Sequence, residues 1–473
     1  MTPRPVALSS ILIYLAVAAL WAVLFSRSFW LNNIWAWSAG IVYILYDTVL
    51  MAIVVWQTFP LRHPAAMEFS TVAAIRPTLG IIIAAHNEAL NLPTALTALF
   101  RQTDLPDVVL IADDGSTDAT ALFLQQEFGL EMPAIDGLSA AGATVPILRW
   151  MRLTHMGKAQ ALNAAIERIE TDIVVTLDAD TFLGDDAIAE MRRAFAIDRH
   201  LVAASGVLVP VCNSSMSGRV MQLFQTYEYI RNIVSRFAWM RMNSLLLISG
   251  AFAAFRREAL LAVGGFDPDC LVEDYELTHR MHRYAIDHGL PWQLRMVGSA
   301  VARTEAPSEV AAFLRQRRRW FAGFLQTQYW NRDMTGNRRY GALGKYMLPI
   351  KAVDTMQPIY GLTGFGLLVV LLLTGKQTIA VPVIGIITAK IAADFLVYLW
   401  TVHLYRRLTG GRVQASVSTA AFAAVVEPFS FQLLRHAGAA WGWIAFLGGS
   451  NSWGFRERAS RLRSSHDLPS AGE

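Results

Sequence analysis

Asp178 and Asp180 are the acidic residues whose spacing most directly suggests chemistry. They are separated by one alanine and come directly after the Val- and Ile-rich run 173–177. In an extended chain, residues two apart point to the same side, so both carboxylates face one way. Two such carboxylates can hold a divalent cation, and the cation can bridge a diphosphate. A turn or a helix cap explains the same pattern without any ligand.

Two further segments place charged groups where a strand ends or a helix begins. Asp113 and Asp114 follow the run 108–112, where a turn or a cap is an adequate interpretation. Lys158 follows Gly157 and opens a helical pattern. An ammonium beside the positive end of a helix suits a phosphate or a uracil carbonyl, although a solvated lysine is the simpler interpretation.

Glu273 and Asp274 begin another helix, shortly after the glycine-containing segments 249–251 and 264–267. Acids at the start of a helix usually cap it. Here the surroundings are otherwise apolar and lined by glycine. One carboxylate could therefore be held near an acceptor hydroxyl as a general base.

The pentad 316–320 reads Gln-Arg-Arg-Arg-Trp. On a helix, Gln316, Arg319 and Trp320 share one face, because they stand at i, i+3 and i+4. A guanidinium fork can clamp a diphosphate, and a large aromatic ring can stack on a sugar. The alternative is a basic interfacial helix on anionic lipid, which could hold at the same time for Arg317 and Arg318.

The elements that must position these residues alternate between two patterns. The strand-like runs are 79–84, 108–112 and 173–177, and the helical patterns are 89–102, 117–126 and 158–170. Buried parallel strands with right-handed helical crossovers produce this alternation, and such sheets bind ligands at the carboxyl ends of their strands. The middle of the chain is therefore predicted to be an α/β domain with its acids at one edge of the sheet.

The composition indicates a membrane protein. Hydrophobic residues make up 54% of the 473 residues and charged residues only 16%, which is too apolar for an ordinary soluble enzyme. No basic run interleaved with aromatic residues appears, so nucleic acid is not expected as a partner. Cys212 and Cys270 lack metal-type spacing and fit a reducing cytosolic compartment.

The apolar residues concentrate at the two ends of the chain. The runs 9–26 and 33–57 are each long enough to cross ~30 Å of hydrocarbon. The first could be a signal peptide, but no cleavage site follows it and the second run comes within a few residues. We expect a hairpin of two spans that leaves the middle domain in the cytosol, since Arg4 and Arg62 then lie inside.

Further apolar runs follow the middle domain, at 356–374 and 378–405. The last stretch, 413–449, is either two short passes or one pass with an interfacial helix. The predicted organisation is a transmembrane hairpin at 1–60, a cytosolic domain at 77–340, C-terminal transmembrane helices at 341–450 and a basic cytosolic tail at 451–473.

Charged residues interrupt these C-terminal apolar stretches. Lys390 and Asp394 stand at i and i+4, and Glu427 lies in the last stretch. Charges at mid-membrane seldom face lipid because insertion is costly. Lys390 and Asp394 either neutralise each other on one helix face or, with Glu427 and Trp400, line a polar path for a growing sugar chain.

Taken in order, the motifs resemble those of the family 2 glycosyltransferases with a GT-A fold, and especially the membrane-embedded synthases of cellulose, hyaluronan and poly-N-acetylglucosamine. The resemblance covers 77–324 and rests on Asn87-Glu88, Asp113-Asp114-Gly115, Gly157-Lys158, Asp178-Ala179-Asp180, Glu273-Asp274 and Gln316 with Arg319-Trp320. It implies an α/β GT-A domain in the cytosol, flanked by transmembrane helices. Val272 stands where Thr is commoner, which removes a hydroxyl and leaves the acids in place.

The resemblance also implies roles on the donor side. Asp113 and Asp114 would contact the uridine of a UDP-sugar, with Lys158 nearby. Asp178 would lie on the ribose or diphosphate side. Asp180 would bind Mg²⁺ or Mn²⁺.

On the acceptor side, the resemblance makes Asp274 the general base. Glu273, Gln316, Arg319 and Trp320 would hold the acceptor sugar and the diphosphate. Direct displacement with a base on the acceptor inverts the anomeric carbon, so an α-linked donor would give a β-linked product.

The function implied is a metal-dependent, inverting synthase of a β-linked cell-surface or extracellular polysaccharide in a bacterial inner membrane. It would be processive and would export its product through its own helices, with accessory export proteins as possible partners. One alternative is a single-transfer enzyme that glycosylates a membrane lipid. Another is a transport or receptor component with an inactive transferase domain, which the presence of every required acid disfavours.

Overall fold

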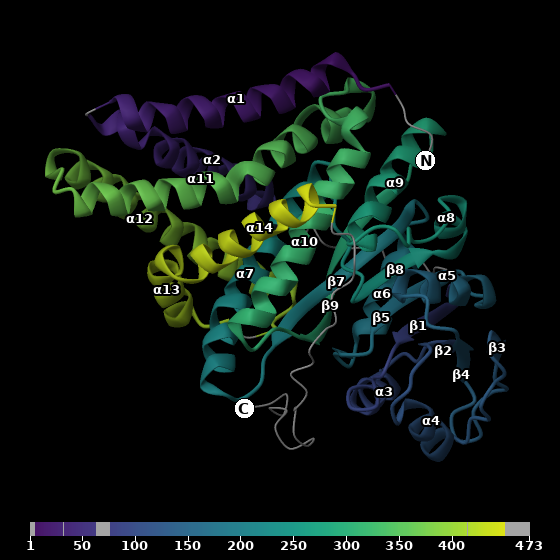
Figure 1. Cartoon of the computed structure of the whole chain (residues 1–473). Helices are drawn as coiled ribbons and strands as arrows, with labels where there is room; N and C mark the ends of the chain where they lie inside the picture. Colours follow the sequence, from purple (N-terminus) through teal and green to yellow (C-terminus); the bar gives the residue numbers. More distant parts are fainter. Residues whose placement is uncertain (1–4, 32, 63–75, 414, 450–473) are drawn as a thin grey trace.

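The computed structural model describes residues 5–31, 33–62, 76–413 and 415–449. The predicted basic tail at 451–473, and with it the arginine-rich C-terminus, lies outside the described residues. In the part described, a mixed sheet occupies one side of the molecule and long helices the other (Figure 1).

The sheet contains nine strands in the described residues, in the order β3-β4-β2-β1-β5-β8-β7-β9-β6. Their bounds are β1 Leu79–Ala85, β2 Val108–Asp114, β3 Gly137–Leu138, β4 Leu148–Leu153, β5 Ile173–Asp178, β6 Thr181–Leu183, β7 Leu201–Val211, β8 Phe252–Arg256 and β9 Gln293–Glu305. The predicted strands β1, β2 and β5 are present and parallel. The sheet as a whole is mixed, because β8 runs antiparallel between β5 and β7.

Strand β1 lies inside the sheet, between β2 and β5, and both of its faces are buried. Ile81 and Ile83 join the core on one face, while Ile82 joins the core on the other. A strand covered on both sides reads as a continuous apolar run rather than an alternating one. The helices around the sheet are α3 Leu92–Phe100, α4 Thr120–Phe128, α5 Lys158–Arg168, α6 Ala187–Ile197, α8 Arg257–Ala262 and α9 Glu273–Asp287.

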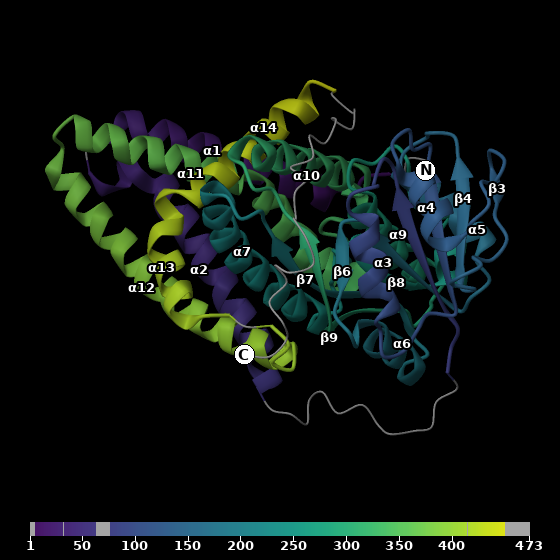
Figure 2. The ribbon, with the colours of Figure 1, turned by 90° about the horizontal axis from the view of Figure 1, so that it is seen from below.

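Two longer helices, α7 (Met216–Arg241) and α10 (Val310–Trp330), lie between the sheet and the apolar helices (Figures 1 and 2). Helix α10 packs closely against α14 (Phe431–Leu447). Gly442 allows this approach, because a Cβ there would lie 2.9 Å from the carbonyl oxygen of Arg318. The helix that carries the pentad is therefore fixed to the last apolar helix.

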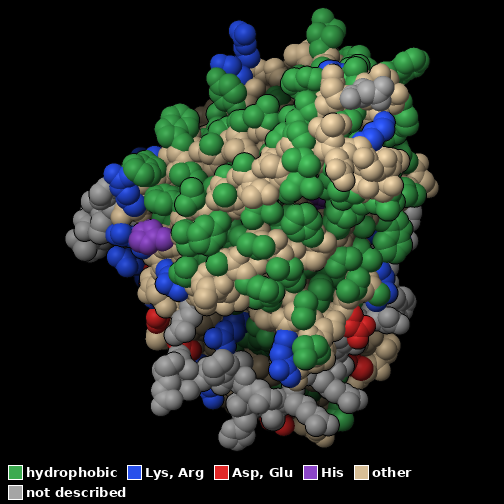
Figure 3. All heavy atoms as spheres, turned by 90° about the vertical axis from the view of Figure 1, so that its left-hand side faces the viewer, with side chains coloured by type: hydrophobic (Ala, Val, Ile, Leu, Met, Phe, Trp, Pro, Cys, Tyr) green, Lys and Arg blue, Asp and Glu red, His purple; other side chains and the backbone are tan. Residues whose placement is uncertain are grey.

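The apolar helices are α1 Leu8–Trp30, α2 Ser38–Thr58, α11 Leu348–Leu373 and α12 Gln377–Leu408, with α13 Val417–Val426 preceding α14. Four helical segments in the described residues are long and apolar enough to cross a membrane. Figure 3 shows hydrophobic side chains dominating the face on this side, with most Lys and Arg side chains around its borders.

The last stretch forms a bent pair rather than a straight helix. The segments Val417–Phe429 and Phe431–Leu447 meet at an angle of 50°, and together they are apolar enough for one broken span or a re-entrant loop. The sequence left two short passes or one pass with an interfacial helix open, and the topology of this stretch stays a prediction.

The charged residues inside the helical region are paired with one another. Lys390 contacts Asp394 as predicted, and its Nζ also lies 2.7 Å from the Asp47 carboxylate of α2. Glu427 accepts hydrogen bonds from Arg231 and Tyr398.

Trp400, by contrast, does not join these charges through any hydrogen bond found in the described residues. Its indole N–H donates to Thr58 at 3.0 Å, and its ring stacks on Phe59 at 5.8 Å. Trp400 therefore ties α12 to the end of α2.

Candidate active site

The candidate residues gather at the carboxyl ends of the parallel strands. In the sheet register, Ala85 of β1 pairs with Asp113 of β2, and Ala84 pairs with Asp178 of β5. The two acids therefore flank the end of the central strand. This is the edge at which an open α/β sheet binds its ligands.

Asp113 and Asp114 are both buried, and their carboxylates accept hydrogen bonds from different segments. One oxygen of Asp113 accepts from the backbone of Ser116 at 2.9 Å and the other from the Trp150 indole at 3.2 Å. Asp114 accepts from the backbone N–H groups of Met156 and Gly157 at 2.7 and 2.9 Å. Asp113 thus anchors its own turn, whereas Asp114 ties β2 to the loop that leads into α5.

A histidine pair beside Asp114 was not predicted from the sequence. The rings of His86 and His155 stack with centroids 4.1 Å apart. The Nδ1 of His86 lies 2.7 Å from the Asp114 carbonyl oxygen, and that of His155 lies 2.9 Å from the Asp114 carboxylate. One ligand atom from each residue lies within 4.8 Å of the others, so the trio has the composition of a metal site. The available signal was position, since His86 directly precedes Asn87-Glu88 and His155 comes two residues before Gly157-Lys158.

Lys158 connects two of the acids that the sequence predicted for the site. Its Nζ lies 2.5 Å from Asp178 and 3.5 Å from Glu273. Burial alone would lower the pKa of Lys158, but these two carboxylates outweigh it and raise the pKa. Burial also raises the pKa of Glu273, and Lys158 opposes that rise only in part. The lysine therefore remains charged and provides a fixed cation at the sheet edge.

Asp180 lies just beyond Asp178, with only 5% of its surface exposed. Its backbone carbonyl accepts from Glu305 at 3.1 Å, which secures the turn between β5 and β6. Mg²⁺ usually takes one or two carboxylates and fills its remaining positions with phosphate oxygens and water. Asp180, with Asp178 beside it, fits such a cation bound together with a diphosphate.

Asp274 stands at the first turn of α9, where the helix dipole favours a negative charge. Its two oxygens accept from the backbone N–H groups of Gly250 and Tyr275, both at 2.8 Å. A Cβ at position 250 would lie 3.3 Å from the Asp274 Cβ, so glycine leaves room for this contact. The carboxylate is held in one orientation and remains partly exposed.

The pentad on α10 meets this site through Arg319. One guanidinium nitrogen of Arg319 donates to the Leu271 carbonyl at 3.0 Å, two residues before Glu273. The Gln316 side-chain oxygen is buried and has no hydrogen-bond partner among the described residues. Trp320 is partly buried and packs against the core.

Arg317 does not face lipid, although one interpretation of the sequence placed it there. It is buried, with 7% of its surface exposed, and its guanidinium lies 2.7 Å from the Glu228 carboxylate of α7. An ion pair formed by residues 89 positions apart leaves no trace in local sequence patterns. The lipid-facing interpretation is therefore wrong for Arg317.

Arg236 of α7 is a further residue missed from the sequence. Burial lowers the pKa of its guanidinium, while the negative charge of nearby Asp274 opposes the shift. A single arginine within a long helical pattern carries no signal of its own. Its place near Asp274 follows only from the packing of α7 beside the site.

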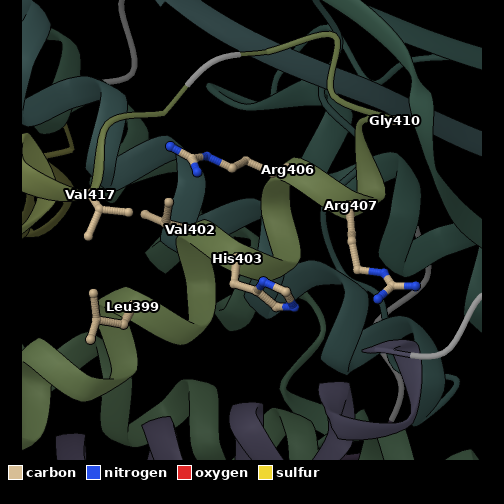
Figure 4. Close-up of a pocket in the computed structure, with 7 residues that line it drawn as sticks. All are labelled: Leu399, Val402, His403, Arg406, Arg407, Gly410 and Val417. Carbon is tan, nitrogen blue, oxygen red and sulfur yellow. The ribbon is translucent and has the colours of Figure 1, made fainter.

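A shallow pocket lies elsewhere, at the end of α12 (Figure 4). None of the candidate site residues lines it. Its lining is Leu399, Val402, His403, Arg406, Arg407, Gly410 and Val417.

Two family descriptions match the chain. Residues 80–264 match "Glycosyl transferase family 2", and residues 173–406 match "Glycosyl transferase family group 2". Together these matches run from residue 80 in β1 to residue 406 in α12.

Curated relatives of two kinds are similar to the chain. A poly-beta-1,6-N-acetyl-D-glucosamine synthase from Staphylococcus epidermidis is 26% identical over 284 residues, covering 60% of this chain and 62% of the relative. A beta-monoglucosyldiacylglycerol synthase from Synechocystis sp. is 25% identical over 358 residues, covering 72% and 68%. The chain thus matches about three fifths of the length of the first relative.

Among solved structures, a mannosyltransferase from Pyrobaculum calidifontis in complex with GDP-Man and Mn²⁺ superimposes with a TM-score of 0.52. The match covers 83% of this chain and 99% of the other at 19% identity. At this identity the likeness shows a shared fold.

Proposed function

Because this chain belongs to the family 2 glycosyltransferases and has their GT-A fold, we propose that it transfers sugar from a UDP-sugar to a growing β-linked polysaccharide. The observation that carries the proposal is the convergence at one sheet edge. Lys158 bridges Asp178 and Glu273, and Asp274 follows Glu273 directly. A cation for the donor and a fixed carboxylate for the acceptor thus stand side by side.

In the proposed reaction, the acceptor hydroxyl attacks the anomeric carbon of the donor. A new carbon–oxygen bond forms while the bond to the diphosphate breaks, and the electron pair leaves with the diphosphate. Asp274 takes the hydroxyl proton, since its two backbone hydrogen bonds hold the carboxylate in place. Attack opposite to the leaving group inverts the anomeric configuration.

Lys158 and Arg319 supply fixed positive charge for the departing diphosphate. Preorganised charges aimed at developing negative charge stabilise a transition state without reorganising during the reaction. Asp180 and Asp178 would hold Mg²⁺ or Mn²⁺, and a bound cation would neutralise diphosphate charge. The solved neighbour is in complex with GDP-Man and Mn²⁺, which supports a metal dependence for this chain.

We further propose a processive synthase in a bacterial inner membrane, with the catalytic domain in the cytosol. Four membrane-length helices among the described residues and a polysaccharide synthase among the relatives support this. Arg62, Arg406 and Arg407 would then lie on the cytosolic side, as the positive-inside rule expects. The alternative, a single transfer to a membrane lipid, is supported by the glycolipid synthase among the relatives.

Membranes that contain the chain, incubated with a panel of radiolabelled nucleotide sugars, test the proposal. We expect label from one UDP-sugar to enter a β-linked product of many units, in the presence of Mg²⁺ or Mn²⁺. A product with one sugar on a lipid would favour the alternative. No transfer from any UDP-sugar would contradict the proposed donor.

A further inference from the structure

Arg317 is packed between two aromatic rings of its own helix. Its guanidinium carbon lies 4.5 Å from the centroid of Phe313 and 4.4 Å from that of Trp320. Its Nε has no hydrogen-bond partner among the described residues. A planar guanidinium over an indole gains cation–π attraction and stacking, which a lysine ammonium provides less well. Arg317 therefore contacts the Trp320 ring, which the family resemblance assigns to the acceptor sugar.

The position of Arg317 is fixed from outside α10. Glu228 of α7 is buried, and its carboxylate lies 2.7 Å from Arg317. The same carboxylate lies 3.9 Å from Arg435 of α14. Removing one partner from a buried pair leaves an uncompensated charge, so each group holds the others in place.

The chain of charges continues toward the apolar helices. Arg435 also lies 3.7 Å from Glu427, which accepts a hydrogen bond from Tyr398 of α12. Helix α14 touches the arginine itself, since a Cβ at Gly438 would lie 2.7 Å from the Arg317 Cβ. A continuous path of contacts therefore leads from the Trp320 ring to α12 and α14.

We propose that Arg317 and Glu228 are positioning residues that hold the Trp320 ring against the acceptor sugar. This inference rests on the proposed function, because it concerns the transfer of sugar to an acceptor rather than the binding of the donor. A merely structural ion pair would contribute to stability alone. A positioning pair also sets how often an activated sugar reaches the acceptor instead of water.

The test uses the full chain in lipid nanodiscs with UDP-glucose and UDP-N-acetylglucosamine as donor probes. The main variant replaces the pair by apolar residues, Arg317→Met with Glu228→Leu, because such replacements of buried pairs are often tolerated. Arg317→Lys keeps the charge but loses the planar group. Arg318→Gln is the matched control, since Arg318 lies over Trp441 on α14, 5.0 Å from its ring.

Two quantities are measured on each variant. The first is the ratio of sugar incorporated into product to nucleotide released. The second is the ¹⁹F resonance of Trp320 in protein labelled with 5-fluorotryptophan, identified among the 14 tryptophans by Trp320→Phe. Thermal unfolding verifies that the variants are folded.

For the double variant, we expect normal nucleotide release, a shifted Trp320 resonance and an incorporation ratio roughly 3- to 30-fold lower. Arg317→Lys should give an intermediate ratio, and Arg318→Gln should match the unmodified chain. A normal ratio in the folded double variant overturns the inference, whether or not the resonance moves. If the unmodified chain transfers no sugar from any UDP-sugar of the panel, the proposed function fails, and the resonance alone decides: an unmoved signal overturns the positioning of Trp320.

Discussion

At the scale of single residues, Asp274 combines a fixed orientation with partial exposure. Both of its oxygens accept backbone N–H groups, so an asparagine there turns an amide donor toward one of those donors. The Asp274→Asn variant therefore loses the base and also one hydrogen bond. We expect turnover to fall ~10²–10⁴-fold or more while donor binding persists.

Donor titration and turnover of Asp274→Asn, measured side by side, check this expectation. Asp269→Asn is a suitable control, because Asp269 is exposed and lies in the loop before α9. Near-normal turnover of Asp274→Asn would remove the residue from its proposed role.

Asp180 leads to a different expectation at the same scale. Asp180→Asn should weaken donor binding and abolish its dependence on Mg²⁺ or Mn²⁺, because an amide is a poor substitute for a carboxylate ligand. Calorimetric titration of the donor with and without the metal measures this. Asp185→Asn, on an exposed neighbour, should bind as the unmodified chain does. Unchanged metal dependence in Asp180→Asn would direct attention to the trio of His86, Asp114 and His155.

At the scale of elements, the close packing of α14 on α10 positions the pentad. A side chain at Gly442 would meet the backbone of Arg318 at 2.9 Å and that of Ala322 at 3.1 Å. Backbone atoms cannot rotate away, so Gly442→Val must separate the helices. Overpacking of this kind typically costs ~1–3 kcal/mol.

We expect Gly442→Val to lower both thermal stability and sugar transfer, since α10 carries Arg319 and Trp320. Gly366→Ala on α11 is the control, because a Cβ there meets nothing within 4 Å. A stable, fully active Gly442→Val variant would show that the contact does not constrain the pentad.

At the scale of the whole molecule, the paired charges among the apolar helices bear on product export. Lys390 contacts Asp394 and also Asp47, so the group is a three-residue cluster rather than an isolated pair. Replacing Lys390 and Asp394 with leucine leaves Asp47 without its cation. The matched variant therefore adds Asp47→Asn to remove the unpaired charge.

If the cluster lines a path for the polymer, the triple variant should still release nucleotide but lose long, exported product. Chain length by gel filtration and export from sealed vesicles measure this. Product of normal length and normal export would mean that the cluster serves only helix packing.

The sequence alone determined the parts of this protein that depend on local order. Val- and Ile-rich runs predicted β1, β2 and β5, because buried parallel strands need apolar residues on both faces. The acids after those runs were predicted to lie at one sheet edge, because the carboxyl ends of parallel strands meet there. The lengths of the apolar runs predicted membrane-length helices, and the i, i+4 spacing predicted the contact of Lys390 with Asp394.

Only the tertiary structure decided which charges meet across long separations. The pairing of Arg317 with Glu228, the approach of Asp47 to Lys390 and the antiparallel insertion of β8 each join distant segments. Three adjacent arginines look alike in the sequence, yet Arg317 is buried in an ion pair and Arg319 reaches the Leu271 carbonyl beside Glu273. The difference arises because the packing of α7 and α14 against α10 determines which side of the helix is desolvated.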